Sequence, residues 1–318
     1  MAASTQAHTT KPPASKPARE RGPARRNLFW IALAAPGIIW LILLFIIPFY
    51  AVLAIAMGQL NRLFESPIAV WNPAGWNASN IIDAYRDVVG PTSFAGPIVI
   101  RTIIYVAIAS LLCLVIGYPA AYFVARFAGR RKALFLVLLI APFWISYMMR
   151  MLAWVDLLQT GGYLNRALMD LDLTSHQINW LGGMSVTVIL GLVYGYVPYM
   201  ILPLFAGLDR LPQSALEAAR DLGASRVETF RRVILPMSRP TVVASLLLTS
   251  LPMLGDYFTN DLLSGSPSTA MVGNLINETV LTPGESGLAG AFVLLVLLVS
   301  LIPMIYYVRS SGRESVAT

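Results

Sequence analysis

The stretch LPQSALEAARDLGASRVETFRRVILP, residues 211–236, interrupts the hydrophobic runs of this chain. It lies between two strongly apolar segments, yet it is too polar to cross a bilayer itself. Seven charged side chains lie within it: Glu217, Arg220, Asp221, Arg226, Glu228, Arg231 and Arg232. A polar, helix-forming segment in a membrane-embedded chain is expected to be a docking surface for something in the aqueous phase. It is called the 211–236 loop below.

The composition indicates an integral membrane protein. Hydrophobic residues make up 57% of the 318 residues and charged residues only 12%, whereas soluble domains contain about 25% charged residues. The single cysteine, Cys113, excludes a disulfide framework and a cysteine-rich metal site. The two histidines, His8 and His176, lie in unrelated regions, which argues against a histidine-based metal centre. We attribute the net charge of +7 to membrane topology and expect no nucleic-acid partner.

Six runs are long enough to cross a bilayer, which takes about 20 apolar residues. They cover residues 28–57, 97–125, 133–156, 185–208, 240–259 and 287–308. The first run is about twice as long as the apolar part of a signal peptide, so we expect it to be retained. The sequence therefore predicts an all-α membrane protein with six transmembrane helices in a domain at residues 28–309. A disordered basic tail is expected at residues 1–27, and a second tail at 310–318.

Prolines fall in or near these runs, among them Pro142, Pro198 and Pro252. Proline inside a span kinks the helix and frees a backbone carbonyl, which neighbouring helices or a cavity can satisfy. Gly191 and Gly195 in the fourth run form a small-xxx-small pair, which is typical of close helix packing.

The segments between the runs alternate in net charge. Residues 1–27, 126–132, 209–239 and the C-terminal tail are basic, whereas residues 58–96, 156–184 and 256–287 are acidic. The positive-inside rule then predicts that both termini and the 211–236 loop lie in the cytoplasm. The acidic segments are expected on the other side.

The 211–236 loop is expected to form two short helices. Ser214 with Glu217, and Ser225 with Glu228, have the spacing of a capping box. Gly223 is suited to stop the first helix in a left-handed conformation. The second helix is expected to run to about Ile234, and Pro236 ends the motif. An exposed apolar stripe would fit a groove in a partner: Leu216, Ala219, Val227, Phe230 and Ile234. The alternative is an amphipathic connector that lies on the lipid surface.

The spacing of EAA at residues 217–219, Gly223 and Leu235-Pro236 resembles the EAA loop in the membrane subunits of bacterial ABC importers. Val233 stands where that family usually has isoleucine, which is a conservative departure. In that family the loop is the coupling helix that docks into a cytoplasmic ATPase subunit. The resemblance implies that seven residues couple to the ATPase: Glu217, Ala218, Ala219, Gly223, Phe230, Leu235 and Pro236.

Longer segments are similar to the spermidine/putrescine group of polyamine permeases. They are CLVIGYPAAYFVAR (113–126), APFWISYMMRMLAW (141–154), GLVYGYVPYMILPLFAGLDRL (191–211), LGDYFTNDLLSG (254–265) and MVGNLI (271–276). The resemblance implies a binding-protein-dependent ABC importer permease in a bacterial inner membrane, moving a polyamine. Asp256 stands where this group often has glutamate, which leaves the substrate open. Another small organic solute, such as an amino-acid derivative, is the alternative.

The resemblance also implies partners. A separate binding protein would deliver the solute, cytoplasmic ATP-binding subunits would drive alternating access, and a second permease subunit would complete the pore within the lipid. None of the three lysines lies in a phosphate-binding loop, so the partner ATPase would bind ATP and magnesium, and this chain would hold no cofactor. A self-sufficient secondary transporter is disfavoured because we find no convincing internal repeat. A membrane enzyme is disfavoured because no catalytic set clusters.

Ionisable residues in or near a span are candidates for the substrate pathway. Arg150 lies in the middle of the third run, Asp156 near its outer end, and Asp256 near the outer end of the fifth. Four aromatic residues accompany them: Trp144, Tyr147, Trp154 and Tyr257. Carboxylates and aromatic faces would attract an organic cation.

Five of these residues also have a structural interpretation. Trp154 and Tyr257 could be interfacial anchors, and both aspartates could be solvated loop acids. Arg150 could pair with an acid on a neighbouring helix, or its charge could indicate that the substrate has a carboxylate.

Overall fold

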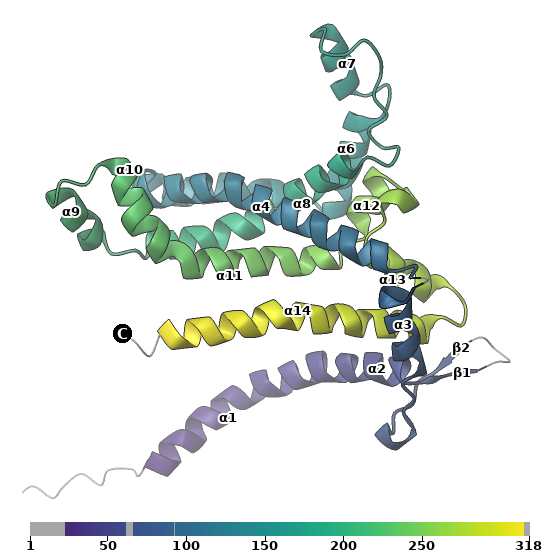
Figure 1. Ribbon diagram of the computed structural model, residues 1–318. Helices are drawn as coiled ribbons and strands as arrows, with labels where there is room; N and C mark the ends of the chain where they lie inside the picture. The colour runs from purple at the N-terminus through teal and green to yellow at the C-terminus, as the bar shows by residue number, and fades with distance from the viewer. Residues whose placement is uncertain (1–22, 62–65, 92, 315–318) are drawn as a thin grey trace, which may run out of the picture. The chain divides into compact units, whose positions relative to one another are not determined.

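The computed structural model describes residues 23–61, 66–91 and 93–314, which are almost entirely helical (Figure 1). The chain divides into two units, residues 1–51 and residues 52–318. In the first unit, α1 (Pro23–Leu41) continues through a wide, π-helical turn, η1 (Ile42–Ile46), into α2 (Ile47–Ala56). α2 ends in the second unit. α1 takes in residues 23–27 of the predicted tail, where Pro23 suits a first helical position. The rest of that tail lies outside the described residues.

The second unit contains twelve more helices and a small β-ribbon in its described part. The long helices are α4 (Gly96–Arg126), α8 (Ser185–Asp209), α11 (Leu235–Leu254) and α14 (Ser286–Glu314). Shorter helices connect them: α3 (Ser79–Val89), α5 (Lys132–Ile140), α6 (Tyr147–Leu158), α7 (Tyr163–Asp170), α9 (Gln213–Asp221), α10 (Arg226–Thr229), α12 (Phe258–Leu263) and α13 (Val272–Leu281). The ribbon pairs β1 (Gln59–Asn61) with β2 (Ser66–Ile68) in antiparallel register, a small departure from the all-α prediction.

Within the described residues, five helical segments are long and apolar enough to span a membrane, and a bent pair would make a sixth. The five cover Trp30–Ala56, Gly96–Arg126, Ser185–Asp209, Arg226–Leu254 and Ser286–Arg309. Four of them agree closely with the predicted runs, because the length of an apolar run is a strong signal in a sequence. The remaining two predicted spans differ in ways that matter for the site.

The predicted span at residues 133–156 is broken. α5 ends at Ile140, a tight turn covers Ala141–Trp144, and α6 starts at Tyr147. The segments on either side of the break are bent by 80°. Pro142 explains the break, because it lacks the amide hydrogen that would continue the helix and its ring clashes with the preceding turn.

The predicted span at residues 240–259 is shifted towards the N-terminus. One helical segment runs from Arg226 through the wide turn η5 (Phe230–Ile234) to Leu254. The prediction that the second helix of the loop ends at about Ile234, before Pro236, is therefore wrong. The wide turn directly before it, in which the amide of Leu235 donates to the carbonyl of Phe230, gives the proline ring room.

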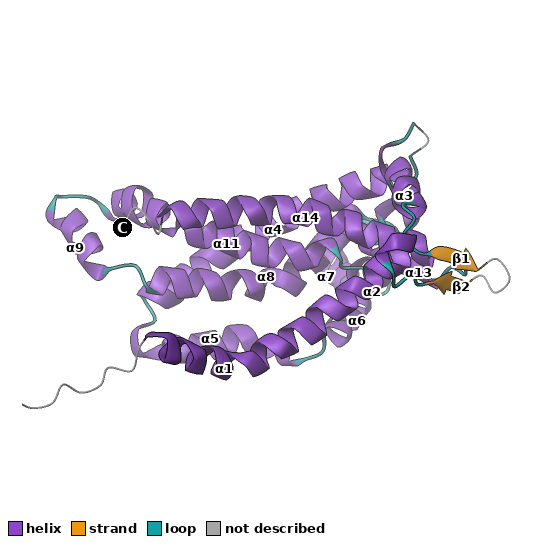
Figure 2. Ribbon diagram, turned by 90° about the horizontal axis from the view of Figure 1, so that it is seen from below, coloured by secondary structure: helices purple, strands orange, loops and turns teal. Residues whose placement is uncertain are grey.

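The core of the second unit lies where α4, α8 and α11 pack side by side. Gly191 and Gly195 confirm the prediction of close packing, because a Cβ on Gly191 would lie 2.3 Å from Leu263 and one on Gly195 would lie 2.7 Å from the Tyr147 ring. A buried hydrogen bond of 2.9 Å joins the hydroxyls of Tyr118 and Ser238 across α4 and α11. Figures 1 and 2 show α9 beyond one end of α8 and α11, and α13 near the other.

α4 is tied to the segment before α13 by Arg101. Its Nε donates to the carbonyl of Ala270 at 2.9 Å, Nη1 to that of Ser268 at 2.6 Å and Nη2 to that of Pro267 at 3.2 Å. Gly273 then lets α13 approach closely, since a Cβ there would lie 2.7–2.8 Å from backbone atoms of Gly255 and Asp256. These contacts fix the backbone on which Asp256 is held.

Replacing Gly273 with alanine is expected to lower stability by about 1–3 kcal/mol, because the added methyl group meets backbone atoms that cannot rotate away. The measurement is the thermal unfolding midpoint of the detergent-solubilised protein. Gly161→Ala is the matched control, because nothing lies within 4 Å of the Cβ position there. Equal midpoints for the two variants would contradict this packing.

Candidate functional site

The first helix of the 211–236 loop starts differently from the prediction. α9 begins at Gln213 with Pro212 as its N-cap residue, and no side chain caps it. The capping box predicted at Ser214 and Glu217 is therefore wrong. Ser214 lies two residues after the cap position, because the backbone becomes helical directly after Pro212.

The end of α9 confirms the prediction for Gly223. This residue has a φ of +83°, in the left-handed region. Its amide donates to the carbonyl of Arg220 at 2.9 Å, and the amide of Ala224 donates to that of Ala219 at 3.0 Å. This pair of bonds is the Schellman motif, which ends a helix and turns the chain sharply.

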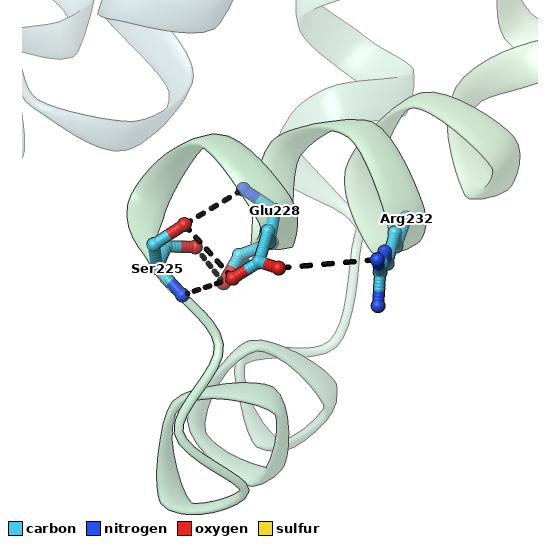
Figure 3. Close-up of polar contacts among 4 residues, drawn as sticks. Ser225, Glu228 and Arg232 are labelled. Atoms are coloured by element: carbon cyan, nitrogen blue, oxygen red, sulfur yellow. Dashed lines mark hydrogen bonds and ion pairs between the residues drawn. The ribbon is translucent and has the colours of Figure 1, made fainter.

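The second capping box is confirmed (Figure 3). The Glu228 amide donates to Ser225 Oγ at 3.3 Å, and the Ser225 amide donates to Glu228 Oε2 at 3.0 Å. Arg232 lies 3.9 Å from the same carboxylate. This reciprocal pair of hydrogen bonds fixes the start of α10.

The apolar side chains of the loop divide between two faces. Leu216 and Ile234 are buried in the core of the unit, so the prediction that they belong to an exposed stripe is wrong. The half-buried Phe230 makes edge contacts with Tyr118 and Tyr122 of α4, with ring centroids 5.9 Å and 5.6 Å apart. These contacts hold the loop against the end of α4.

The opposite face of the loop is open. Leu222 is 88% exposed, and Glu217 and Ala218 are exposed as well. Val227 is 65% exposed but lines a cavity together with Leu216, Phe230 and Ile234, so it does not belong to this face. Leu235 is exposed, whereas Ala219 and Pro236 are half-buried. This mixed apolar and charged face is available for a partner.

A second candidate site surrounds Asp256, between α12 and the break before α6. Asp256 is only 7% exposed, so it is no solvated loop acid. Its Oδ2 accepts from the hydroxyls of Tyr147 at 2.8 Å and Thr259 at 2.6 Å, and Oδ1 accepts from the amide of Thr259 at 3.0 Å. A cavity of about 330 Å³ opens beside it. The carboxylate thus forms part of a largely aromatic wall.

Arg150 lines the same cavity and is 7% exposed. Its guanidinium lies 4.1 Å from the centroid of the Phe143 ring and 5.4 Å from that of Tyr147. Nε and Nη1 are buried without a hydrogen-bond partner, and no ion pair to Arg150 is found in the described residues. The prediction that it pairs with an acid of a neighbouring helix is therefore not met by the described part of this chain.

The cavity brings together only some of the predicted pathway residues. Tyr147, Arg150, Asp256 and Tyr257 line it, whereas Trp144, Trp154 and Asp156 do not. Trp144 is 78% exposed, Asp156 is exposed, and Trp154 packs against Tyr194 with centroids 5.4 Å apart. Sequence reasoning missed further aromatic neighbours: Phe143, Tyr196, Tyr199 and Phe258. Tyr196 and Tyr199 could have been found, because residues three apart share one helix face.

Known proteins resemble the chain along nearly its whole length. The family described as "Binding-protein-dependent transport system inner membrane component" matches residues 24–315. The chain belongs to this family. It is thus a multi-pass inner-membrane protein of a transport system that works with partner proteins.

The spermidine/putrescine transport system permease protein PotB of Escherichia coli K12 is 35% identical over 230 residues, covering 72% of this chain and 82% of PotB. PotB of Haemophilus influenzae is 33% identical over 271 residues, covering 84% and 89%. The inner membrane ABC transporter permease protein YdcU of Escherichia coli K12 is 32% identical over 216 residues, covering 64% and 68%. The two PotB proteins confirm the resemblance to the polyamine permease group.

Among solved structures, a chain of a bacterial alginate ABC transporter, crystallised with a periplasmic protein bound to an alginate pentasaccharide, has a TM-score of 0.69. The sequences are 17% identical, and the match covers 91% of this chain and 96% of the other. At this identity the likeness concerns the fold alone.

Arg150→Met is expected to leave the unfolding midpoint unchanged or to raise it, because methionine keeps much of the volume and removes a buried cation with unpaired donors. Arg101→Met is the matched control, since all three of its donor nitrogens bind carbonyls, and it should lower the midpoint by several degrees. If Arg150→Met lowered the unfolding midpoint as much as Arg101→Met does, that result would contradict the absence of hydrogen-bond partners at Nε and Nη1 of Arg150.

Proposed function

We propose that this chain is the transmembrane subunit of an ATP-driven ABC importer, and that the 211–236 loop docks onto a cytoplasmic ATPase subunit. The observation that carries this proposal is the division of the loop into two faces. Leu216, Phe230 and Ile234 hold it to the membrane core, while Glu217 and Leu222 on the other face stay open. A docking element needs both a firm attachment and a free surface.

In this proposal both termini and the 211–236 loop lie in the cytoplasm, as the basic segments favour. The unbroken helical path from Arg226 to Leu254 supports a mechanical role, because a push on the loop would be passed directly to a span. Alternating access would follow when ATP binding moves the loop. ATP and magnesium would be bound by the partner ATPase, with no cofactor in this chain.

The remaining partners follow from the family. A second permease subunit would complete the pore, because the five or six candidate spans of this chain form only half of the usual pair. A binding protein would deliver the solute from the outer side, where the acidic segments would lie. Transport of the solute into the cytoplasm would then depend on all of these subunits together.

We propose a polyamine as the cargo, on the basis of the relatives named for spermidine and putrescine and of the Asp256 cavity. An ammonium group of the cargo would approach the carboxylate of Asp256 and the faces of Tyr147 and Tyr257. Arg150 would weaken this attraction. A transport site has to release its cargo, and a nearby fixed cation keeps binding from becoming too tight.

A carboxylate-bearing amino-acid derivative is the second candidate cargo. The observation in its favour is the pair of unpaired donors on Arg150, which a carboxylate would satisfy. The two cargoes are distinguished by uptake of spermidine and of an ω-amino acid into vesicles that contain the assembled transporter. Uptake of the amino acid alone would contradict the polyamine assignment.

Gly223→Val is expected to abolish capture of the ATPase by this chain in a pull-down from detergent. A β-branched residue at this φ costs about 1–2 kcal/mol and would redirect α9. Gly223→Asn is the matched control, because asparagine tolerates the left-handed conformation, and it should retain the ATPase. If both variants bind equally, the helix end does not orient the docking face. If wild type also fails to bind, the importer proposal is wrong.

Asp256→Asn is expected to reduce ATP-driven spermidine uptake by about tenfold, which corresponds to losing one charged contact. Asp156→Asn removes the same charge from an exposed site outside the cavity and should leave uptake within about twofold. Unfolding midpoints establish that both variants are folded. Equal effects on uptake would remove Asp256 from the pathway.

A further inference from the structure

A cavity of about 610 Å³ opens between the 211–236 loop and the end of α4. Three arginines line it, one from each neighbouring segment: Arg126 at the end of α4, Arg220 on α9 and Arg226 at the start of α10. None of the described residues that line it is acidic. The cavity therefore has a marked positive charge.

The charge of these arginines is not neutralised by the described part of the chain. No ion pair is found there for Arg126, Arg220 or Arg226. Arg126 donates to the side chain of Gln213 at 3.3 Å and to the carbonyl of Leu211 at 3.2 Å, but its Nε is buried without a partner. Donors are thus left over for an anionic ligand.

The rest of the lining is largely apolar. Tyr122, Phe127 and Phe230 contribute aromatic rings, and Tyr122 makes edge contacts with both of the others, with centroids 5.9 Å and 5.6 Å apart. Phe127 is 66% exposed. A small soluble anion needs only the arginines, whereas a ligand with an anionic head and a hydrocarbon tail would use both parts of the lining.

The cavity lies where a membrane surface is expected. α4 has 31 residues, so at about 1.5 Å per residue it is longer than the hydrocarbon layer of about 30 Å. Arg126 is its last residue, and the basic residues Arg130, Arg131 and Lys132 follow after three further residues. Lipid headgroups occupy this level of a bilayer.

We propose that this cavity binds the phosphate headgroup of an anionic phospholipid. Arg126, Arg220 and Arg226 donate to the phosphate oxygens, as guanidinium groups do in phosphate sites. The upper part of an acyl chain lies along Tyr122, Phe127 and Phe230. The bound lipid joins α4 to both helices of the 211–236 loop and stiffens the loop against the membrane core.

The test is native mass spectrometry of the full-length chain after delipidation from nanodiscs that contain equal amounts of phosphatidylglycerol and phosphatidylcholine. The wild type should retain phosphatidylglycerol in preference. Arg220→Gln with Arg226→Gln should lower that retention by about tenfold or more, since each arginine adds to the attraction of an anionic lipid. Both side chains are exposed and make no ion pair among the described residues, so this variant should fold.

Arg130→Gln with Arg131→Gln is the matched control. It removes the same charge from exposed side chains of the adjacent segment, outside the cavity lining, and should leave the retention unchanged. An equal loss of phosphatidylglycerol in both double variants would mean that general surface charge holds the lipid, and would contradict a specific site in the cavity. Equal retention by wild type and the cavity variant would also contradict it.

Two further measurements distinguish the lipid from other ligands that could occupy the cavity. Displacement of the lipid by millimolar inorganic phosphate would assign the arginines to a soluble phosphate ligand instead. Loss of the lipid once the ATPase subunit binds would mean that the three arginines contact that protein instead. Persistence of phosphatidylglycerol in both cases supports the proposal. Because the lipid retention of wild type and variants is measured on this chain alone, that result does not depend on whether the loop captures an ATPase.

Discussion

The packing of Phe230 against Tyr118 and Tyr122 is the interaction on which the rest of the structure depends. It fixes the start of the Arg226–Leu254 segment to the end of α4, and Leu216 and Ile234 complete the attachment from both helices of the loop. Without this packing, the helices of the loop would still begin and end at the same residues, but they would have no defined orientation relative to α4. With it, the exposed face that includes Glu217 and Leu222 has a fixed orientation relative to α4 and α8.

The wide turn η5 gives this attachment a mechanical consequence. Pro236 would break a regular helix, but the turn at Phe230–Ile234 accommodates it and the helical path continues. The same arrangement precedes Pro48, where η1 covers Ile42–Ile46. At the other end of the Arg226–Leu254 segment, the chain turns at Gly255 directly into Asp256 and α12. A displacement of the loop along this segment would therefore reach the cavity beside Asp256 without passing a flexible joint.

Features that depend on neighbours in sequence could be predicted from the sequence. The left-handed turn at Gly223, the capping box at Ser225 and most span positions belong to this group, because caps and apolar runs are local signals. The failure at Ser214 is also local, since the helix begins directly after Pro212. Features that depend on distant segments could not be predicted. The burial of Asp256 depends on Tyr147, more than 100 residues away in sequence, and the inward turn of Leu216 depends on α4 and α8.

The central claim is that the 211–236 loop and α11 move as one body. The most direct measurement is the distance between spin labels at Arg231 and Leu248, both exposed and on the Arg226–Leu254 segment, in the assembled transporter with and without ATP. The account predicts a single, narrow distance distribution that does not change when ATP binds. A shortened or broadened distribution in the ATP state would mean that the helical path bends at η5, and would contradict the claim.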